Sequence, residues 1–182
     1  MADVVISEFM DESTAAELIA EYDAHWDPEL WGKRDELLAL LADARAIIVR
    51  NATQVNAELL DAAPELKVVA RMGVGLDNID VGACKARGVE VCPAIGANAL
   101  SVAEYVIATA MILLRGPAYF ATQDVLAGKW DRPRFGSGLE LAGRTMGVIG
   151  FGSIGQVVGA RARAMGMDVI AYDALLADDA AD

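Results

Sequence analysis

The stretch Gly150-Phe151-Gly152-Ser153-Ile154-Gly155 decides the fold of the second half of this chain. A Gly-x-Gly-x-x-Gly element alone is weak evidence, because glycine-rich turns occur in many unrelated folds. Here the element follows the apolar run 145–149. A helical pattern begins within the element and covers 154–165, and a β-rich run at 168–172 comes next. This order predicts a strand, a phosphate-binding turn, a helix and a second strand at the start of a Rossmann dinucleotide-binding domain.

The three glycines of this element have separate physical roles. Gly150 permits the tight turn, and Gly152 lets the backbone approach a pyrophosphate because it has no Cβ. Gly155 allows the helix to pack closely on the sheet, and the first N–H groups of that helix face the phosphates. The competing interpretation is that the glycines serve only the packing of strand and helix.

An acidic residue ends the second predicted strand. Asp173 lies eighteen residues after Gly155, at the distance where a carboxylate accepts hydrogen bonds from the adenosine ribose. Ala174 and Leu175 supply no cation for a 2′-phosphate, so the sequence favours NAD over NADP. Alternatively, Asp173 is an ordinary surface carboxylate.

The first half of the chain alternates short β-rich runs with amphipathic stretches, which predicts βαβ units around a parallel sheet. A further short helix is expected to start at Asp77–Asp80 and to end at Gly88 in a left-handed cap. We expect an open α/β sheet that closes near residue 95 and a flavodoxin-like domain over 1–97. The expected strands are 4–6, 46–49, 68–70 and 89–91, and the other expected helices lie near 14–20, 37–42 and 59–62.

The second domain, 98–182, is expected to begin with a helix and an arm over 101–143. Ser101 and Glu104 have the spacing of a capping box, which predicts a helix from Ser101 to about Leu114. The arm that follows is rich in turn residues and contains Trp130 and Phe135, so we interpret it as an irregular segment and a candidate interface.

Composition narrows the functional classes. The chain has 182 residues, 55% of them hydrophobic, and a net charge of −12 that disfavours nucleic acid and anionic membrane surfaces. The apolar stretch 102–114 is too short to span a bilayer, so we expect a cytoplasmic protein. Two cysteines, Cys84 and Cys92, are expected to be core thiols, and with a single histidine they indicate no metal site.

The sequence resembles the D-isomer-specific 2-hydroxyacid dehydrogenases over nearly its whole length. The shared motifs are Arg71 to Asp80 (Arg-Met-Gly-Val-Gly-Leu-Asp-Asn-Ile-Asp), Gly96-Ala97-Asn98, Ser101 to Glu104, Glu140 to Thr145 and the glycine element. The resemblance implies a substrate-binding domain followed by an NAD-binding domain, a cleft between them, and a homodimer formed through the 101–143 helix and arm. The substrate would be a small 2-hydroxy acid or 2-keto acid.

The resemblance also implies site residues. In the substrate-binding domain, backbone N–H groups of Met72 to Gly75 would hold the substrate carboxylate, as expected of a turn after a parallel strand. The expected substrate-binding residues are Arg50, Asn51, Met72, Gly73, Val74 and Gly75. The expected cofactor-binding residues are Val74, which would also touch the nicotinamide, Val102, Gly150, Phe151, Gly152, Ser153, Ile154, Gly155, Tyr172 and Asp173.

Arg50-Asn51-Ala52-Thr53 resembles the phosphoglycerate dehydrogenase branch of the family. A cation at Arg50 would pair with a second anion of the substrate, which favours 3-phosphoglycerate or 3-sulfolactate over glyoxylate, hydroxypyruvate or lactate. The alternative is that Arg50 and Arg71 are solvated or ion-paired arginines.

Family members are longer, and their catalytic arginine, glutamate and histidine come from later in the cofactor domain, beyond residue 182. His25 lies in the first domain, where we expect a structural or exposed histidine, and no catalytic residue is assigned within this chain. We therefore expect these 182 residues alone to be inactive. Two rival functions remain open, an NAD-sensing interaction protein similar to the corepressors of this fold, and a non-functional remnant. Cys92-Pro93 departs from the usual family pattern.

Overall fold

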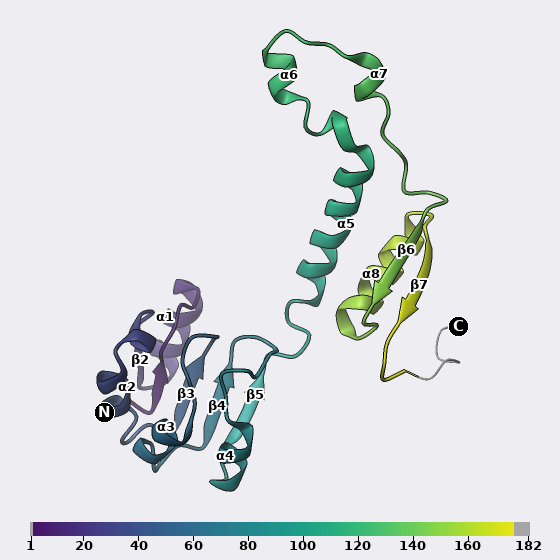
Figure 1. Ribbon diagram of the computed structural model, residues 1–182. Helices are drawn as coiled ribbons and strands as arrows, with labels where there is room; N and C mark the ends of the chain where they lie inside the picture. Colours follow the sequence, from purple (N-terminus) through teal and green to yellow (C-terminus); the bar gives the residue numbers. More distant parts are fainter. Residues whose placement is uncertain (1, 177–182) are drawn as a thin grey trace. The chain divides into compact units, whose positions relative to one another are not determined.

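A computed structural model describes residues 2–176, which form two compact units (Figure 1). The N-terminal unit is Met1–Ile95 and the C-terminal unit is Gly96–Asp182. The sequence predicts that the substrate-binding domain ends at residue 97. The end of the second domain, 177–182, lies outside the described residues.

The N-terminal unit is built on a five-stranded parallel sheet with the order β2-β1-β3-β4-β5, which is the flavodoxin-like order. Strand β2 was not expected from the sequence. Its three residues pair with β1 in the register Val5↔His25, and this short edge strand carries too little alternation to be recognised. The strands are β1 (Val4–Ile6), β2 (Ala24–Trp26), β3 (Ala46–Val49), β4 (Val68–Arg71) and β5 (Glu90–Pro93).

Local capping explains where the helices of this unit begin. Asp11 accepts hydrogen bonds from two N–H groups of α1, Asn56 caps α3 and Asp80 caps α4. Gly88, with φ of 70°, follows the end of α4 as predicted. The helices are α1 (Glu12–Glu21), α2 (Arg34–Leu40), α3 (Ala57–Ala62) and α4 (Val81–Ala86), with a 3₁₀ turn, η1, at Leu30–Gly32.

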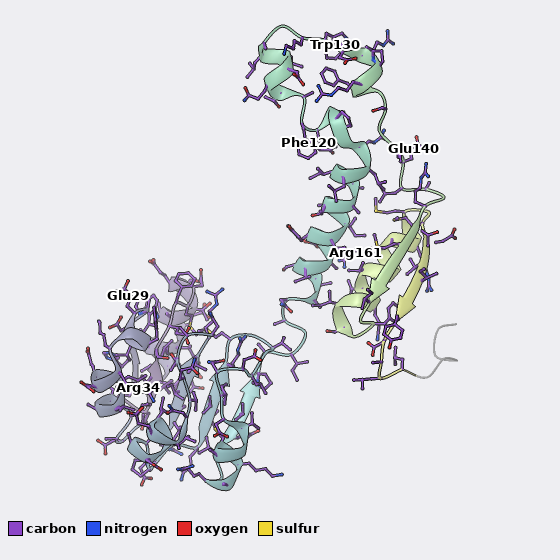
Figure 2. All side chains as sticks on the ribbon, in the orientation of Figure 1. Glu29, Arg34, Phe120, Trp130, Glu140 and Arg161 are labelled. Carbon is purple, nitrogen blue, oxygen red and sulfur yellow. The ribbon has the colours of Figure 1, made fainter. Side chains whose placement is uncertain are left out.

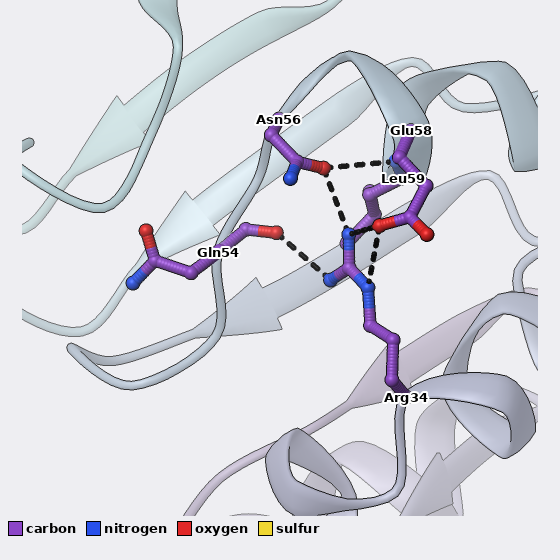
Figure 3. A network of polar contacts seen from close by, with 5 residues as sticks. All are labelled: Arg34, Gln54, Asn56, Glu58 and Leu59. Carbon is purple, nitrogen blue, oxygen red and sulfur yellow. Dashed lines mark hydrogen bonds and ion pairs between the residues drawn. The ribbon is translucent and has the colours of Figure 1, made fainter.

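Arg34, the first residue of α2, ties this helix to the start of α3 (Figure 3). Its guanidinium donates to the Gln54 carbonyl at 3.0 Å, to Asn56 Oδ1 at 2.8 Å and to Glu58 Oε2 at 2.8 Å. Asn56 Oδ1 also accepts a hydrogen bond from Leu59 N–H, so this one amide oxygen caps α3 and binds the guanidinium of Arg34 in α2. The network fixes the chain that leaves β3.

Alternation along the strands gives the sheet two apolar faces. One core cluster contains Val5, Ile47 and Val69 together with residues of α2, α3 and α4, among them the buried Cys84. A smaller cluster on the other face contains Ile6 and residues around α1. Cys84 is therefore a core thiol as expected, whereas the prediction for Cys92 was wrong, because Cys92 is exposed.

The C-terminal unit contains a parallel strand pair connected by a helix. Strands β6 (Thr145–Ile149) and β7 (Asp168–Tyr172) pair in the register Thr145↔Asp168, and α8 (Ser153–Ala164) joins them. The long helix α5 (Ala99–Arg115) packs on α8 through a cluster that includes Ile107 and Ala162. Between α5 and β6 lie a 3₁₀ turn, η2 (Gly116–Ala118), and the short helices α6 (Thr122–Leu126) and α7 (Arg132–Phe135).

The predicted capping box at the start of α5 is wrong. The helix begins at Ala99, its N-cap is Asn98, and no side chain caps it, so Ser101 lies inside the first turn. Alanine and leucine at 99 and 100 favour helix, and Ala99 N–H already bonds the Gly96 carbonyl at 3.1 Å. Glu104 instead lies near Arg161 of α8, which is labelled in Figure 2, with 3.8 Å between Arg161 Nη2 and Glu104 Oε1.

The apolar part of this unit is longer than the sequence analysis expected. The helical span Ala99–Leu126 has 28 residues and contains an 18-residue window with a mean hydropathy of 1.5, which is enough to cross a bilayer by length and composition. Weighing against a membrane span, α5 ends at Arg115, where Gly116 has φ of 52°, and one side of α5 packs on α8. The apolar residues of this span are thus shared between the helix α5 and the arm that follows it, and they do not form one continuous helix.

Candidate cofactor and substrate site

The glycine element connects β6 to α8 as predicted. Gly150 has φ of 92°, a conformation that favours glycine, and its N–H continues the ladder to the Tyr172 carbonyl at 2.7 Å. A Cβ on Gly155 would overlap the carbonyl oxygen of Gly150, whereas a Cβ on Gly152 would meet open space. Gly155 is therefore required by packing, and Gly152 leaves the approach to the turn free.

The start of α8 offers backbone donors. Gly152 is its N-cap residue and no side chain caps the helix, so its first-turn N–H groups are left for another partner. Ser153 is exposed, Ile154 is half-buried, and the Phe151 ring packs over Gly159. This geometry suits a phosphate, since helix N-termini favour anions.

Asp173 meets the glycine element directly. Its Oδ2 accepts the Phe151 N–H at 2.7 Å, and its Oδ1 accepts the Leu175 N–H at 2.9 Å. These bonds, first that of Leu175 and then that of Phe151, hold the pKa of Asp173 below its usual value. The carboxylate is therefore an ionised acceptor beside the turn, and each oxygen keeps a second acceptor site.

The structure brings most of the expected cofactor residues together. Gly150 to Gly155, Tyr172 and Asp173 meet where β6 and β7 end and α8 begins. Tyr172 is exposed at the end of β7. Val102 belongs to the first part of α5 and is half-buried, and Val74 belongs to the N-terminal unit.

The turn after β4 contains the residues expected to hold a substrate carboxylate. Gly73 N–H bonds the Arg71 carbonyl at 2.8 Å, and Met72 N–H bonds the Val49 carbonyl at 2.9 Å. Both donors are thus used inside the protein. Within residues 2–176, the N–H groups of the half-exposed Val74 and of its neighbour Gly75 donate no backbone hydrogen bond, so they are the donors of this turn that remain available to a ligand.

Arg71 is closer to this turn than the sequence indicated. A Cβ on Gly73 would overlap its guanidinium, so the cation lies against the Gly73 backbone. The Arg71 Nε atom is buried without a hydrogen-bond partner, and within residues 2–176 the guanidinium makes no ion pair. The interpretation of Arg71 as a solvated or ion-paired arginine does not describe this half-buried side chain.

The loop after β3 is held by a residue that sequence reasoning missed. The buried Glu8 carboxylate accepts the N–H groups of Arg50 at 2.8 Å, Asn51 at 3.0 Å, Ala52 at 2.9 Å and Thr53 at 3.0 Å. Burial raises the pKa of Glu8, but these four donors outweigh it and leave the pKa below its usual value.

A buried polar network extends from this loop to the glycine turn after β4. Ser7 Oγ and Thr53 Oγ1 lie 2.8 Å apart, and Asn78 Nδ2 donates to the Thr53 carbonyl at 2.7 Å. With Glu8, these are the buried polar residues of the described chain. The carboxyl ends of β1, β3 and β4 thus form one rigid edge, which is where ligands bind in open α/β sheets.

The chain consists of two parallel α/β units. The C-terminal unit has a glycine turn at a helix N-terminus and an acidic residue at the end of the next strand, and these features define a dinucleotide-binding class of protein. The family described as "D-isomer specific 2-hydroxyacid dehydrogenase, catalytic domain" matches residues 3–173. The chain therefore belongs to the D-isomer-specific 2-hydroxyacid dehydrogenases.

Curated relatives are enzymes of this family. The chain is 48% identical to the (S)-sulfolactate dehydrogenase of Chromohalobacter salexigens over all 182 residues, which cover 58% of that protein. It is 46% identical to the D-3-phosphoglycerate dehydrogenase of Mycobacterium leprae, with 96% of this chain and 32% of that protein covered. The chain thus spans 58% or less of the length of these two relatives.

Solved structures show the same fold. A dehydrogenase from Rhizobium meliloti matches 96% of this chain and 60% of its own with a TM-score of 0.77 and 28% identity. The D-lactate dehydrogenase of Aquifex aeolicus, determined with NAD and lactic acid, matches 97% of this chain and 52% of its own, with a TM-score of 0.72 and 26% identity.

Proposed function

We propose that this chain is part of an NAD-dependent oxidoreductase that acts on the CH–OH group of a D-2-hydroxy acid. The observation that carries the proposal is the bond from Phe151 N–H to Asp173 Oδ2, which joins the glycine turn and the acidic strand end into one site. Family membership and a relative solved with NAD support the same cofactor.

The residues of this chain have distinct tasks in that reaction. The N–H groups at the start of α8 would bind the pyrophosphate, and Asp173 would accept the ribose hydroxyls. The backbone at Val74 and Gly75 would bind the substrate carboxylate. When bound, NAD would supply the acceptor for the hydride that leaves C2 of the hydroxy acid. A general base would take the hydroxyl proton, and His25, which lies in the edge strand β2, is not assigned that role.

Two arginines favour a substrate with a second anion. Arg50 is exposed after β3, Arg71 lies against Gly73 after β4, and neither makes an ion pair within the described residues. A sulfonate or phosphate accepts several guanidinium donors at once. We therefore propose 3-sulfolactate or 3-phosphoglycerate as the substrate class, in keeping with the names of the relatives.

The test is a kinetic comparison in the complete protein. We expect kcat/KM with NAD to be at least about tenfold higher for 3-sulfolactate or 3-phosphoglycerate than for lactate, because each extra charged hydrogen bond contributes about 1.5–3 kcal/mol. A clear preference for lactate would contradict the substrate class. Tight binding of NAD without turnover of any 2-hydroxy acid would favour the NAD-sensing alternative.

We also propose that the protein is a homodimer formed through α5 and the arm. Large exposed apolar side chains gather there, among them Leu126 and Trp130 at 76% and 72% exposure, and Trp130 is labelled in Figure 2. Exposed apolar surface of this kind marks protein interfaces.

The chain has a net charge of −12, which disfavours contact with nucleic acid and anionic membrane surfaces. We propose a cytoplasmic enzyme that binds neither nucleic acid nor membranes.

A further inference from the structure

We infer that Glu8 and Phe9 are positioning residues for Arg50. They follow Ser7 after the carboxyl end of β1, and through Arg50 they set the preference for a substrate with a second anion. The inference rests on the proposed function, because Arg50 is the cation proposed to bind that anion. Glu8 places the backbone of Arg50, and Phe9 places its guanidinium.

Glu8 determines the path of the loop that carries Arg50. Its Oε1 accepts the N–H groups of Arg50 and Thr53 at 2.8 and 3.0 Å, and its Oε2 accepts those of Asn51 and Ala52 at 3.0 and 2.9 Å. Successive N–H groups that converge in this way form an anion-binding nest, and here the anion is a side chain of the protein itself. The loop cannot move without breaking charge-assisted bonds.

Phe9 lies beside the guanidinium of Arg50. The Arg50 Cζ atom is 5.9 Å from the centroid of the Phe9 ring, within the range in which a ring face attracts a cation. Phe9 is 61% exposed, so the ring contributes little to the core. Within the described residues the guanidinium of Arg50 makes no ion pair, so this contact with the ring leaves N–H donors for a sulfonate or phosphate.

The Glu8 carboxylate contacts the backbone of Arg50 but does not pair with its guanidinium. Both carboxylate oxygens are occupied by backbone donors, and no ion pair between Glu8 and Arg50 forms. A carboxylate paired with Arg50 would compete with the substrate anion for the same donors. Because backbone N–H groups occupy both oxygens of Glu8, the guanidinium donors of Arg50 stay available to the substrate anion.

The first experiment measures kcat/KM of the complete protein with three variants, Phe9→Leu, Phe9→Tyr and Arg50→Ala. Each variant is assayed with lactate and with one two-anion acid. That acid is 3-sulfolactate or 3-phosphoglycerate, whichever the wild type turns over better. We expect Phe9→Leu to lower kcat/KM about two- to fivefold for the two-anion acid, mainly through KM, and to leave lactate unchanged. Phe9→Tyr keeps a ring face and should retain the wild-type value.

A double variant separates positioning from a general structural effect. In the Arg50→Ala background, Phe9→Leu should add nothing, because the ring then has no cation to place. The inference is overturned if Phe9→Leu lowers both acids equally, if Phe9→Tyr is as impaired as Phe9→Leu, or if the effects of the two substitutions add in full.

The role of Glu8 is tested without a substrate. Hydrogen exchange of the amides of 50–53 should be faster in Glu8→Gln than in the wild type and unchanged in Glu12→Gln, an exposed glutamate of α1. Unchanged exchange in Glu8→Gln would overturn this part. Because Phe9 is exposed, its variants decide the inference even if Glu8→Gln fails to fold. Failure of the proposed function has a separate signature, namely a wild type that neither binds nor turns over either acid.

Discussion

The backbone N–H of Phe151 donates to Oδ2 of Asp173 at 2.7 Å, so the turn expected to hold the pyrophosphate and the acid expected to hold the ribose are in direct contact. A single carboxylate thereby orders the loop and remains an acceptor for a ligand, because each of its oxygens can accept more than one hydrogen bond. Cofactor choice and loop geometry are consequently linked at this position.

Asp173→Arg is expected to weaken NAD binding by about ten- to hundredfold, because two hydroxyl–carboxylate hydrogen bonds are lost. The introduced cation should improve binding of NADP relative to NAD. Titration of the complete protein with both cofactors checks this. Asp168→Arg, at the other end of β7, makes the same charge change and should leave the NAD affinity close to that of the wild type. Unchanged NAD binding in Asp173→Arg would contradict the ribose assignment.

Gly155→Ala should destabilise the C-terminal unit by about 1–3 kcal/mol, because its Cβ overlaps the Gly150 carbonyl oxygen. Gly147→Ala is the matched control, since a Cβ on this glycine of β6 meets nothing within 4 Å. Denaturant unfolding of both variants gives the comparison. Equal stability of the two would show that the packing of α8 on the turn is less tight than described.

Gly152→Ala separates cofactor binding from folding. A Cβ at this position has open space around it, so stability should fall by no more than about 1 kcal/mol, which is the cost of alanine at a helix N-cap. The methyl group would occupy the approach to the turn, and NAD affinity should fall by at least about tenfold. A variant that binds NAD normally would mean that the pyrophosphate does not approach Gly152.

The stability of the N-terminal unit should depend on the charge of Glu8. Its pKa in the folded protein lies below the ordinary value of 4.5, so the stabilisation is fully present above pH 4.5 and is lost as the pH falls through the folded-state pKa. Glu8→Gln should lower the free energy of unfolding by about 3 kcal/mol at neutral pH, because the amide NH2 group of glutamine would face backbone N–H donors and could not accept their hydrogen bonds. It should also lose this acid dependence, which denaturant melts between pH 3 and 7 would measure. A variant with the wild-type pH profile would exclude Glu8 as the cause.

Leu126→Glu is expected to raise the dissociation constant of the dimer at least about tenfold, because a charge would be buried at an apolar contact. Ile19→Glu, on α1 of the N-terminal unit, is the control and should leave the oligomeric state unchanged. Sedimentation of both variants at several concentrations decides the matter. A monomeric wild type would contradict the proposed interface.

Elements with strong local patterns were predicted well from the sequence. The glycine turn, α8 and β7 follow from the glycine spacing together with the apolar runs on either side of it, and the bounds 168–172 of β7 are confirmed. The start of α5 was placed too late, since the Ser101–Glu104 spacing imitates a cap while residues 99 and 100 continue the helix. Edge strand β2 was missed because pairing with β1, rather than its own sequence, makes it a strand.

The candidate site was predictable only where it rests on local backbone geometry. The nest around Glu8 joins residues more than forty positions apart, and no spacing rule connects them. The position of Arg71 against Gly73 likewise depends on a rotamer that the sequence does not specify. Tertiary contacts between strand ends therefore supply the part of the site that motifs leave out.

The most direct test of the account is NADH formation by the complete protein when NAD and a panel of 2-hydroxy acids are supplied, with wild type and Arg50→Ala measured side by side. The account predicts turnover of 3-sulfolactate or 3-phosphoglycerate well above that of lactate, and a loss of this preference of at least about tenfold in Arg50→Ala. A wild type that forms no NADH from any of these acids, or that prefers lactate, would contradict it.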